Sequence, residues 1–274
     1  MRPSGQSDTA VRLNRLPSPE SSRVHFAAAT EARRRLSAHP NNCKTTYDGR
    51  SRQESSSRGG PALENWIKQL FEDEILVRMG HDQRTEDANL GLGWLYYGLT
   101  RLARPSKIVV IGSCRGFSPM LFGKALSENV EDGTVCFIDP SLVNDQWKDA
   151  DQVQEHFRSY GINNIEHHLA TTQQFVESEA YRALGEVGIV MIDGYHTAEQ
   201  AKIDFEAFEP LVPKNGFLLL HDSVLRKTSR IYGEGNEYDT TVYLFVEELK
   251  QNPNLQVLDL PFDRGLTIVR KCST

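Results

Sequence analysis

Apolar residues in the second half of the chain fall into short runs that are separated by longer amphipathic stretches. Runs of this length that end at turn formers predict strands, and they cover 107–111, 134–138, 165–169, 188–192 and 217–220. The stretches between them have helical spacing and cover 119–127, 149–160, 172–184 and 198–208. Strands that alternate with helices indicate parallel crossover units, and strands this apolar are covered on both faces.

The end of the chain departs from this alternation. A helix is predicted over 240–249, and two further strands, 255–260 and 266–270, are joined by only five residues. So short a connection cannot make a parallel crossover, so these strands form an antiparallel hairpin. The pattern therefore predicts an α/β fold, with a doubly wound, mostly parallel seven-stranded sheet that ends in an antiparallel hairpin.

Two amphipathic stretches precede the first strand. Pro61 suits a first helical turn, and apolar residues then recur at helical spacing from Leu63 to Ile75. A second helix is predicted over 89–102. These front helices, 61–104, are rich in Trp and Tyr and could line an acceptor pocket or form the face of a homodimer, although core packing accounts for most of their aromatic residues.

Residues 1–60 have a different composition from the rest. They carry eleven Lys or Arg, five Asp or Glu and ten Ser, a net charge of +6 against −12 for the remainder. We expect this basic, Ser- and Arg-rich segment to be disordered, because it cannot bury enough apolar surface. An organellar transit peptide and a docking arm are the alternatives, and Asp8, Glu20 and Glu31 weaken the transit interpretation.

Composition excludes several classes of protein. The net charge of −6 argues against a dedicated nucleic-acid binder, and no apolar run approaches the roughly 18 residues that a membrane span needs. The four cysteines are scattered and form no C-x-x-C pair, so a disulfide framework or a zinc ribbon is not expected. We expect a cytoplasmic protein whose partner is a small molecule rather than a nucleic acid or a membrane.

The turn after the first strand has the chemistry of a ligand site. Residues 112–119 carry two glycines, which let backbone N–H groups approach a ligand, and Ser118 and Pro119 suit the N-cap and first position of the next helix. A dinucleotide fingerprint needs glycines where this chain has Cys114 and Phe117, which disfavours a dehydrogenase. A tight connection without a ligand is the alternative.

Asp139 follows the second strand. An acid at this tip can accept both hydroxyl groups of a ribose, although it could also form the turn before Pro140. Together with the first turn, Asp139 indicates a nucleoside cofactor that lacks a pyrophosphate.

Four segments carry a resemblance to a known family: Ile111–Ser118 (IGSCRGFS), Phe137–Pro140 (FIDP), Met191–His196 (MIDGYH) and Gly216–Asp222 (GFLLLHD). In this order they resemble class I S-adenosylmethionine-dependent methyltransferases, with their Rossmann-like fold. They are most similar to the small-molecule O-methyltransferase branch of catechol, caffeoyl-CoA and macrocin types. The resemblance covers about residues 90–271, and it implies a methyltransferase domain over 105–274.

The resemblance implies S-adenosylmethionine (SAM) as cofactor and a small-molecule acceptor, methylated on a hydroxyl. The segment 170–172 would lie near the adenine and Asp139 would hold the ribose. The expected cofactor-binding residues are Gly112, Ser113, Gly116, Ser118, Asp139, Thr171, Thr172 and Asp193. Val110 stands where the family usually has an acid, and Cys114 where it often has a glycine. These departures keep open a regulatory module with a degenerate pocket; an oxidoreductase or hydroxylase-like protein on a related sheet is a further alternative.

The ends of the fourth and fifth strands carry the candidate chemistry. Asp193 and Asp222 match metal ligands of the resembled branch, so Mg²⁺ is the expected ion, with helix capping as the alternative. His196 and His221 are the candidate catalytic bases. Helix capping is the alternative for His196, and support of a metal ligand or packing is the alternative for His221. Asp204 matches a polar family position, but we expect it on a solvated face.

A long loop, 223–239, follows the fifth strand. A loop of this length often covers a site. Its basic residues could favour an anionic acceptor, although solvation accounts for them equally well.

Overall fold

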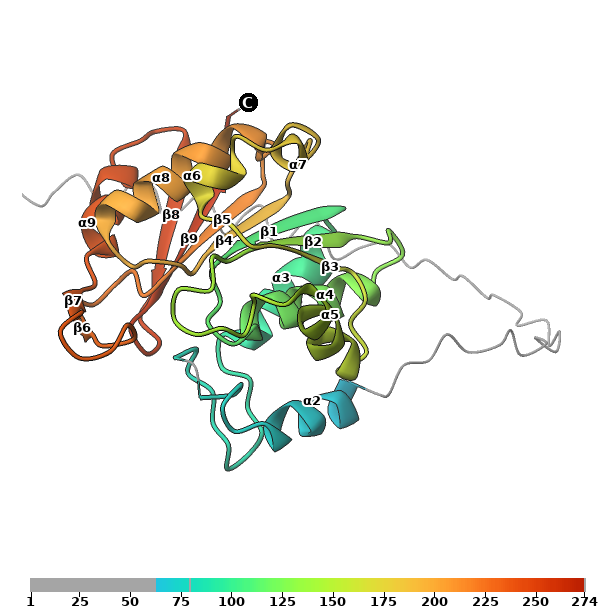
Figure 1. Ribbon diagram of the computed structural model, residues 1–274. Coiled ribbons are helices and arrows are strands. Elements are labelled where there is room, and N and C mark those ends of the chain that lie inside the picture. Colours follow the sequence, from blue (N-terminus) through green and yellow to red (C-terminus); the bar gives the residue numbers. More distant parts are fainter. Residues whose placement is uncertain (1–62, 79, 274) are drawn as a thin grey trace, which may run out of the picture. The chain divides into compact units, whose positions relative to one another are not determined.

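The computed structural model describes residues 63–78 and 80–273, and a seven-stranded sheet runs through this part of the chain (Figure 1). The strand order is β3-β2-β1-β4-β5-β9-β8, with bounds β1 Lys107–Ile111, β2 Thr134–Ile138, β3 Ile165–His168, β4 Ile189–Ile192, β5 Phe217–His221, β8 Leu255–Leu260 and β9 Leu266–Lys271. Strands β1 to β5 pair in parallel, and β9 pairs antiparallel with both β5 and β8. The predicted fold class and terminal hairpin are confirmed.

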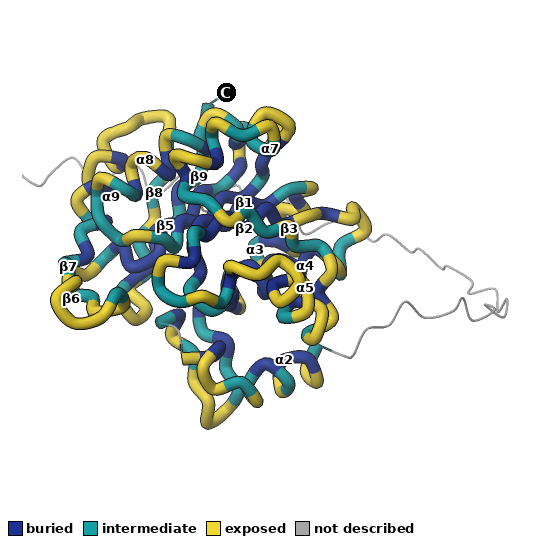
Figure 2. The backbone as a smooth tube through the Cα atoms, viewed as in Figure 1, coloured by how far each residue is buried: buried dark blue, intermediate teal, exposed yellow. Residues whose placement is uncertain are grey.

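Helices cover both faces of the sheet, as the apolar strands require. One hydrophobic core joins alternate strand residues such as Val110 and Phe137 to α3 (Gly93–Ala103), α4 (Phe117–Ser127) and α5 (Ala150–Ser159). The other joins their neighbours, such as Val109 and Ile138, to the helices α6 (Thr172–Phe175), α7 (Glu179–Arg182), α8 (Ala198–Phe208) and α9 (Val242–Leu249). In Figure 2 the central strands, such as β1 and β5, are accordingly among the most buried segments.

The front helices, α2 and α3, pack on the same face of the sheet as α4 and α5. Helix α2 (Leu63–Glu72) buries Trp66 and Leu70, and the Trp66 indole donates a hydrogen bond to the carbonyl of Tyr160 at 2.8 Å. Helix α3 buries Tyr96 against Phe122 of α4. The front helices thus contribute to the core. The predicted segment 1–60, its disorder and its roles lie outside the described residues.

Three predicted helix boundaries are wrong, each for a local reason. Helix α3 begins at Gly93 rather than 89, because Gly91 has a φ of +56°. The stretch 172–184 is two short helices, since Ser178 caps a new helix by accepting a hydrogen bond from the Tyr181 N–H. Helix α2 ends at Glu72, which leaves Ile75 outside it and 60% exposed.

The start of α4 also differs from the prediction. Its N-cap is Gly116, with a φ of +88°, and its first residue is Phe117, so Ser118 and Pro119 lie inside the first turn. A Cβ on Gly116 would come within 2.9 Å of the Trp147 ring. Packing and a left-handed backbone therefore require this glycine, and the predicted cap at Ser118 is wrong.

The loop after β5 contains a two-stranded hairpin, β6 (Thr228–Ser229) and β7 (Tyr238–Asp239). Two of its three basic residues pair with its own acids: Arg226 contacts Asp239, and Arg230 lies 4.0 Å from Glu237. These pairs leave little net charge for an anionic acceptor. Within 63–78 and 80–273, no helix combines the length and the apolar character needed to cross a bilayer.

Candidate functional site

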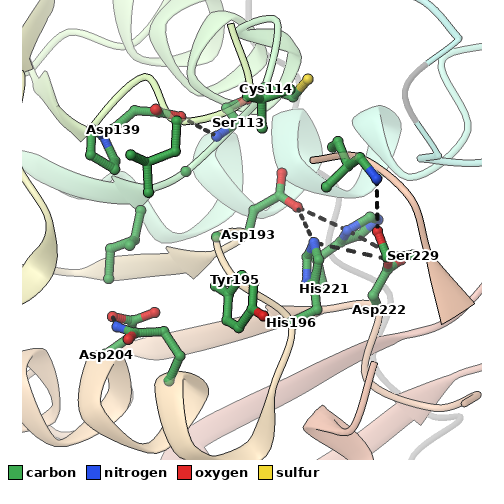
Figure 3. A pocket seen from close by; sticks show the side chains of 18 of the residues that line it. Ser113, Cys114, Asp139, Asp193, Tyr195, His196, Asp204, His221, Asp222 and Ser229 are labelled. Atoms are coloured by element: carbon green, nitrogen blue, oxygen red, sulfur yellow. Dashed lines mark hydrogen bonds and ion pairs between the residues drawn. The ribbon is translucent and has the colours of Figure 1, made fainter. Parts of the chain in front are cut away.

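A cavity of about 1000 Å³ opens at the carboxyl ends of the parallel strands (Figure 3). Its walls come from the turns after β1, β2, β3, β4 and β5 and from the β6–β7 hairpin. Ligand sites of doubly wound sheets lie at this edge, because the loops diverge there. The cavity brings together most of the expected site residues: Gly112, Ser113, Asp139, Thr171, Thr172, Asp193, His196, His221 and Asp222.

The turn after β1 holds its shape through close backbone packing. Gly112 has a φ of +71°, and a Cβ there would lie 2.5 Å from the Cα of Gly194 and 2.6 Å from the Asp193 carbonyl oxygen. No other residue would fit this contact. Ser118 and Gly116 are not among the residues that line the cavity. Ser118 is buried, and its hydroxyl lies 2.9 Å from that of Ser113, so it supports the turn from behind.

Asp139 lies at the tip of β2 with a largely buried carboxylate. One oxygen accepts a hydrogen bond from the Ser113 N–H at 3.2 Å, and the other accepts one from the Ser141 N–H at 2.7 Å. Burial raises its pKa, while these two hydrogen bonds lower it. Each oxygen has a further lone pair, so the carboxylate can still accept hydrogen bonds from two ligand hydroxyls.

Asp204 lies in the wall of the cavity rather than on a solvated face, so that expectation is wrong. The residue is 1% exposed, and its Oδ1 accepts hydrogen bonds from Thr172 Oγ1 at 2.5 Å and from Gln200 Nε2 at 2.8 Å. Burial raises its pKa from the usual 3.8 to about 6, although both hydrogen bonds lower it. At neutral pH a buried negative charge therefore borders the cavity.

Replacing Asp204 with asparagine is expected to stabilise the fold above pH 6. Because burial raises the carboxyl pKa, the folded protein loses stability as the pH rises from 3.8 to about 6. The asparagine variant avoids this loss, so its free energy of unfolding should exceed that of the wild type by on the order of 1–3 kcal/mol at pH 7.5. Urea unfolding at pH 4.5 and 7.5 measures the effect. An advantage that does not grow with pH would contradict it.

Asp193 and His221 form a buried pair at the tips of β4 and β5, because Ile192 pairs with Leu220 in the sheet. His221 Nδ1 lies 2.9 Å from Asp193 Oδ1, and Nε2 donates a hydrogen bond to the Gly80 carbonyl at 2.9 Å. Burial opposes both charges, but the pair outweighs it: the pKa of His221 rises to about 9 and that of Asp193 falls to about 2.

Two further residues complete this cluster, and the sequence did not identify them. His81, from the segment between α2 and α3, places its Nε2 3.6 Å from Asp193 Oδ2 and its Nδ1 3.1 Å from the Tyr96 hydroxyl. Burial, followed by the charge of His221, lowers its pKa to about 3, so it is neutral. Arg264, between β8 and β9, donates a hydrogen bond from Nη1 to Asp222 Oδ2 at 2.7 Å.

His196 is the most exposed histidine of the cluster that lines the cavity. Its side chain is 15% exposed, and its Nε2 lies 3.9 Å from both Asp193 Oδ1 and Asp222 Oδ2. Burial and the neighbouring positive charges of His221 and Arg264 lower its pKa, although the two carboxylates raise it. A neutral imidazole beside the cavity can accept a proton.

Besides the Arg264 Nε–H donor, two buried atoms in the cluster lack a hydrogen-bond partner among residues 63–78 and 80–273: His221 Nδ1 and Asp222 Oδ1. They lie 3.4 Å apart, and the contact of Nδ1 with Asp193 Oδ1 is an ion pair rather than an aligned hydrogen bond. Buried polar atoms are normally satisfied, and a nitrogen and a carboxylate oxygen this close together are donors of the kind that bind cations. His196, His221 and Asp222 have ligand atoms within 4.8 Å of one another, as do His81, Asp193 and His221, so either group could hold a divalent metal ion.

The donor chemistry around this point departs from a magnesium site. Mg²⁺ prefers oxygen ligands, whereas His221 offers a nitrogen. Ser223, which follows Asp222, is no substitute, since its hydroxyl lies 2.7 Å from that of Thr267. The residues therefore fit a divalent cation, but not one that demands oxygen alone.

Three tyrosines form an aromatic wall over the mouth of the cavity. Tyr195 stacks on Tyr238 with ring centroids 4.3 Å apart, and Tyr232 lies 5.6 Å from Tyr195. Two of the three come from the β6–β7 hairpin, which confirms that the long loop covers the site. Tyr195 itself also lines the cavity.

Comparison with known proteins agrees with this geometry. Residues 109–223 match the methyltransferase domain family. The chain is 29% identical over 150 residues to the uncharacterized protein y4gI of Sinorhizobium fredii; the match covers 49% of this chain but only 15% of that protein's length.

Solved structures share the fold at low sequence identity. The SAM complex of the O-methyltransferase TomG from Streptomyces achromogenes is 16% identical, with 77% of this chain and 96% of that chain covered, at a TM-score of 0.51. The S-adenosylhomocysteine complex of the Podospora anserina methyltransferase PaMTH1 is 17% identical, with 79% and 90% covered, also at 0.51. At this identity the likeness concerns the fold.

Proposed function

We propose that this protein transfers a methyl group from SAM to a hydroxyl of a small-molecule acceptor, because residues 109–223 match the methyltransferase domain family. One observation supports the proposal most. A single cavity contains both a ribose-type acid at the tip of β2 and a cluster of acids and histidines at the tips of β4 and β5. A nucleoside and an acceptor can therefore lie side by side.

In this proposal the chain's own residues hold the cofactor at the carboxyl ends of β1 and β2. The Asp139 carboxylate accepts hydrogen bonds from the ribose hydroxyls, and the backbone of Gly112 and Ser113 approaches the methionine part. Bound SAM supplies a methyl group on a sulfonium, which is already activated for transfer. The protein mainly has to align the acceptor and remove its proton.

Replacing Asp139 with alanine is expected to weaken the binding of S-adenosylhomocysteine at least tenfold, because two ribose hydrogen bonds are lost. Isothermal titration calorimetry measures this affinity, and NAD should not bind to the wild type. The exposed Asp151, in the first turn of α5, provides a matched control as Asp151→Ala. An unchanged affinity in Asp139→Ala would remove the ribose role.

We assign the general base to His196 rather than His221. His196 is neutral and borders the cavity, and its Nε2 is not engaged in a hydrogen bond with any residue of the described chain. His221 already points one nitrogen at the Gly80 carbonyl and the other at Asp193. His196 would take the acceptor proton, and the Asp193 and Asp222 carboxylates would stabilise the resulting imidazolium.

We also propose a divalent cation held by Asp222 Oδ1 and His221 Nδ1 beside Asp193, where the cation would displace the proton that otherwise keeps His221 charged. A bound cation would supply Lewis acidity that lowers the pKa of an acceptor hydroxyl. The two unpartnered atoms support this assignment, and the imidazole nitrogen favours Mn²⁺, Fe²⁺ or Zn²⁺ over the expected Mg²⁺. Arg264 holds the other oxygen of Asp222 and orients this carboxylate.

A panel of hydroxylated small molecules, incubated with the protein and radiolabelled SAM, tests the function. Transfer of label to at least one hydroxyl compound is the expected result. Cofactor binding at micromolar affinity without turnover across the panel would instead indicate a regulatory module that keeps the pocket. Failure to bind either SAM or S-adenosylhomocysteine would refute the proposal.

A further inference from the structure

The Asp204 carboxyl is satisfied on one oxygen only. Thr172 and Gln200 both donate to Oδ1, whereas Oδ2 makes no hydrogen bond with any residue in 63–78 or 80–273. The carboxyl nevertheless lines the cavity, beside the backbone of Gly194. The open oxygen can therefore accept a hydrogen bond from a donor on a ligand in the cavity.

The hydrogen-bonding polarity around Asp204 is fixed. Gln173 Nε2 donates to Gln200 Oε1 at 3.1 Å, so the Gln200 amide nitrogen is left to face Asp204. Both protein neighbours thus present donors to Oδ1, and the open oxygen can only accept. No charged side chain contributes to the shifted pKa of Asp204, so it has no ion-pair partner there.

The place of Asp204 in the cavity indicates which part of the cofactor it meets. This step depends on the proposed function. The strand order places β3 on one side of β2, and β1, β4 and β5 on the other. With the ribose at Asp139 on β2 and the reacting groups at β4 and β5, the base extends toward β3. There Thr172, the direct partner of Asp204, lines the cavity.

We infer that Asp204 accepts a hydrogen bond from the exocyclic amino group of adenine and makes the site selective for adenine over 6-oxopurines. The adenine amino group is a donor, which matches the open Oδ2. The 6-oxo group of hypoxanthine is an acceptor and would face the carboxylate oxygen without a proton between them. Sites built around a hydrogen bond to one ligand group reject analogues that lack it.

Competing ligands that differ at this one position test the inference. Calorimetry compares S-adenosylhomocysteine with S-inosylhomocysteine in the wild type and in Asp204→Asn. The wild type should prefer the adenosyl compound at least tenfold. In the variant, Oδ1 can still accept from Thr172, and Nδ2 can donate to a 6-oxo group, so the preference should fall to within threefold of unity. The control Asp151→Asn, on exposed α5, should keep the wild-type ratio.

Two further ligands test whether Asp204 contacts the adenine ring or another part of the cofactor. 5′-Methylthioadenosine lacks the amino acid part, so it should lose affinity in Asp204→Asn if the contact is with the base. The wild type alone gives a further test, because an N6,N6-dimethyl analogue has no N–H to donate and should bind at least tenfold more weakly than S-adenosylhomocysteine.

Three outcomes would overturn the inference. They are equal wild-type affinity for the adenosyl and inosyl compounds, an unchanged preference in the variant, and undiminished binding of the dimethyl analogue. A wild type that binds no S-adenosylhomocysteine refutes the proposed function itself. Wild-type binding without base selectivity refutes the role of Asp204 alone.

Discussion

Replacing His196 with alanine is expected to lower kcat at least 100-fold while the affinity for S-adenosylhomocysteine changes less than threefold. A positioned general base contributes about 10²–10⁴ to a rate. His196 is the cluster's only histidine that we assign to proton transfer, since His221 and His81 face partners within the protein. Steady-state kinetics with the best acceptor from the panel, together with calorimetry, measure both quantities.

His168 provides the control for this substitution. It lies in β3, does not line the cavity, and pairs with Glu166 near the surface. His168→Ala should therefore keep kcat within a small factor of the wild type. A kcat that survives in His196→Ala would show that another group, or solvent, removes the acceptor proton. A matching loss of cofactor affinity would indicate a binding role for His196 instead.

The strands, and the contact between Asp193 and His221 at their ends, were predictable from sequence for a physical reason. Parallel strands covered on both faces must be apolar along their length, so the runs at 107–111 and 217–220 stand out from amphipathic helices. The polar residues that follow such runs meet at one edge of the sheet. Asp193 and His221 follow and end neighbouring strands, and their side chains indeed lie 2.9 Å apart.

The residues that sequence reasoning missed come from segments without a periodic signal. His81 lies in an irregular connection, and nothing in its neighbours indicates that it reaches Asp193. Arg264 could have been found from register, because His221 pairs with Leu266 and the hairpin turn must then lie beside Asp222. Asp204 was misplaced because the partner that buries it, Thr172, is 32 residues away in the chain.

The sequence also does not show which neighbour comes close to a glycine, because that neighbour is often distant in the chain. Gly112 and Gly116 were expected to open space for a cofactor, and Gly112 does border the cavity. Gly116, the N-cap of α4, instead makes room for the Trp147 side chain. A glycine in a turn predicts that another group comes close to the backbone, but the sequence does not show whether that group belongs to a ligand or to the protein.

Removal of divalent metal ions is expected to lower methyl transfer at least tenfold, because a cation between Asp193, Asp222 and His221 would favour the deprotonated acceptor. Activity should return at lower concentrations of Mn²⁺, Fe²⁺ or Zn²⁺ than of Mg²⁺, since imidazole nitrogen binds first-row transition metals more tightly than hard cations. Dialysis against chelator, calorimetric titration of each metal into the apoprotein, and assays after re-addition measure the effect.

The variant His221→Asn tests the nitrogen ligand directly. It replaces an imidazole with an amide oxygen, so the affinity for Zn²⁺ should fall more than tenfold and that for Mg²⁺ should change much less. The alternative to a metal ion is that positive side chains of the protein balance the two carboxylates. Arg264 neutralises Asp222, and a protonated His221 neutralises Asp193. If these two side chains suffice, the protein keeps full activity after chelation and no metal binds in the titration. That result would contradict the metal site and would leave His196 as the base.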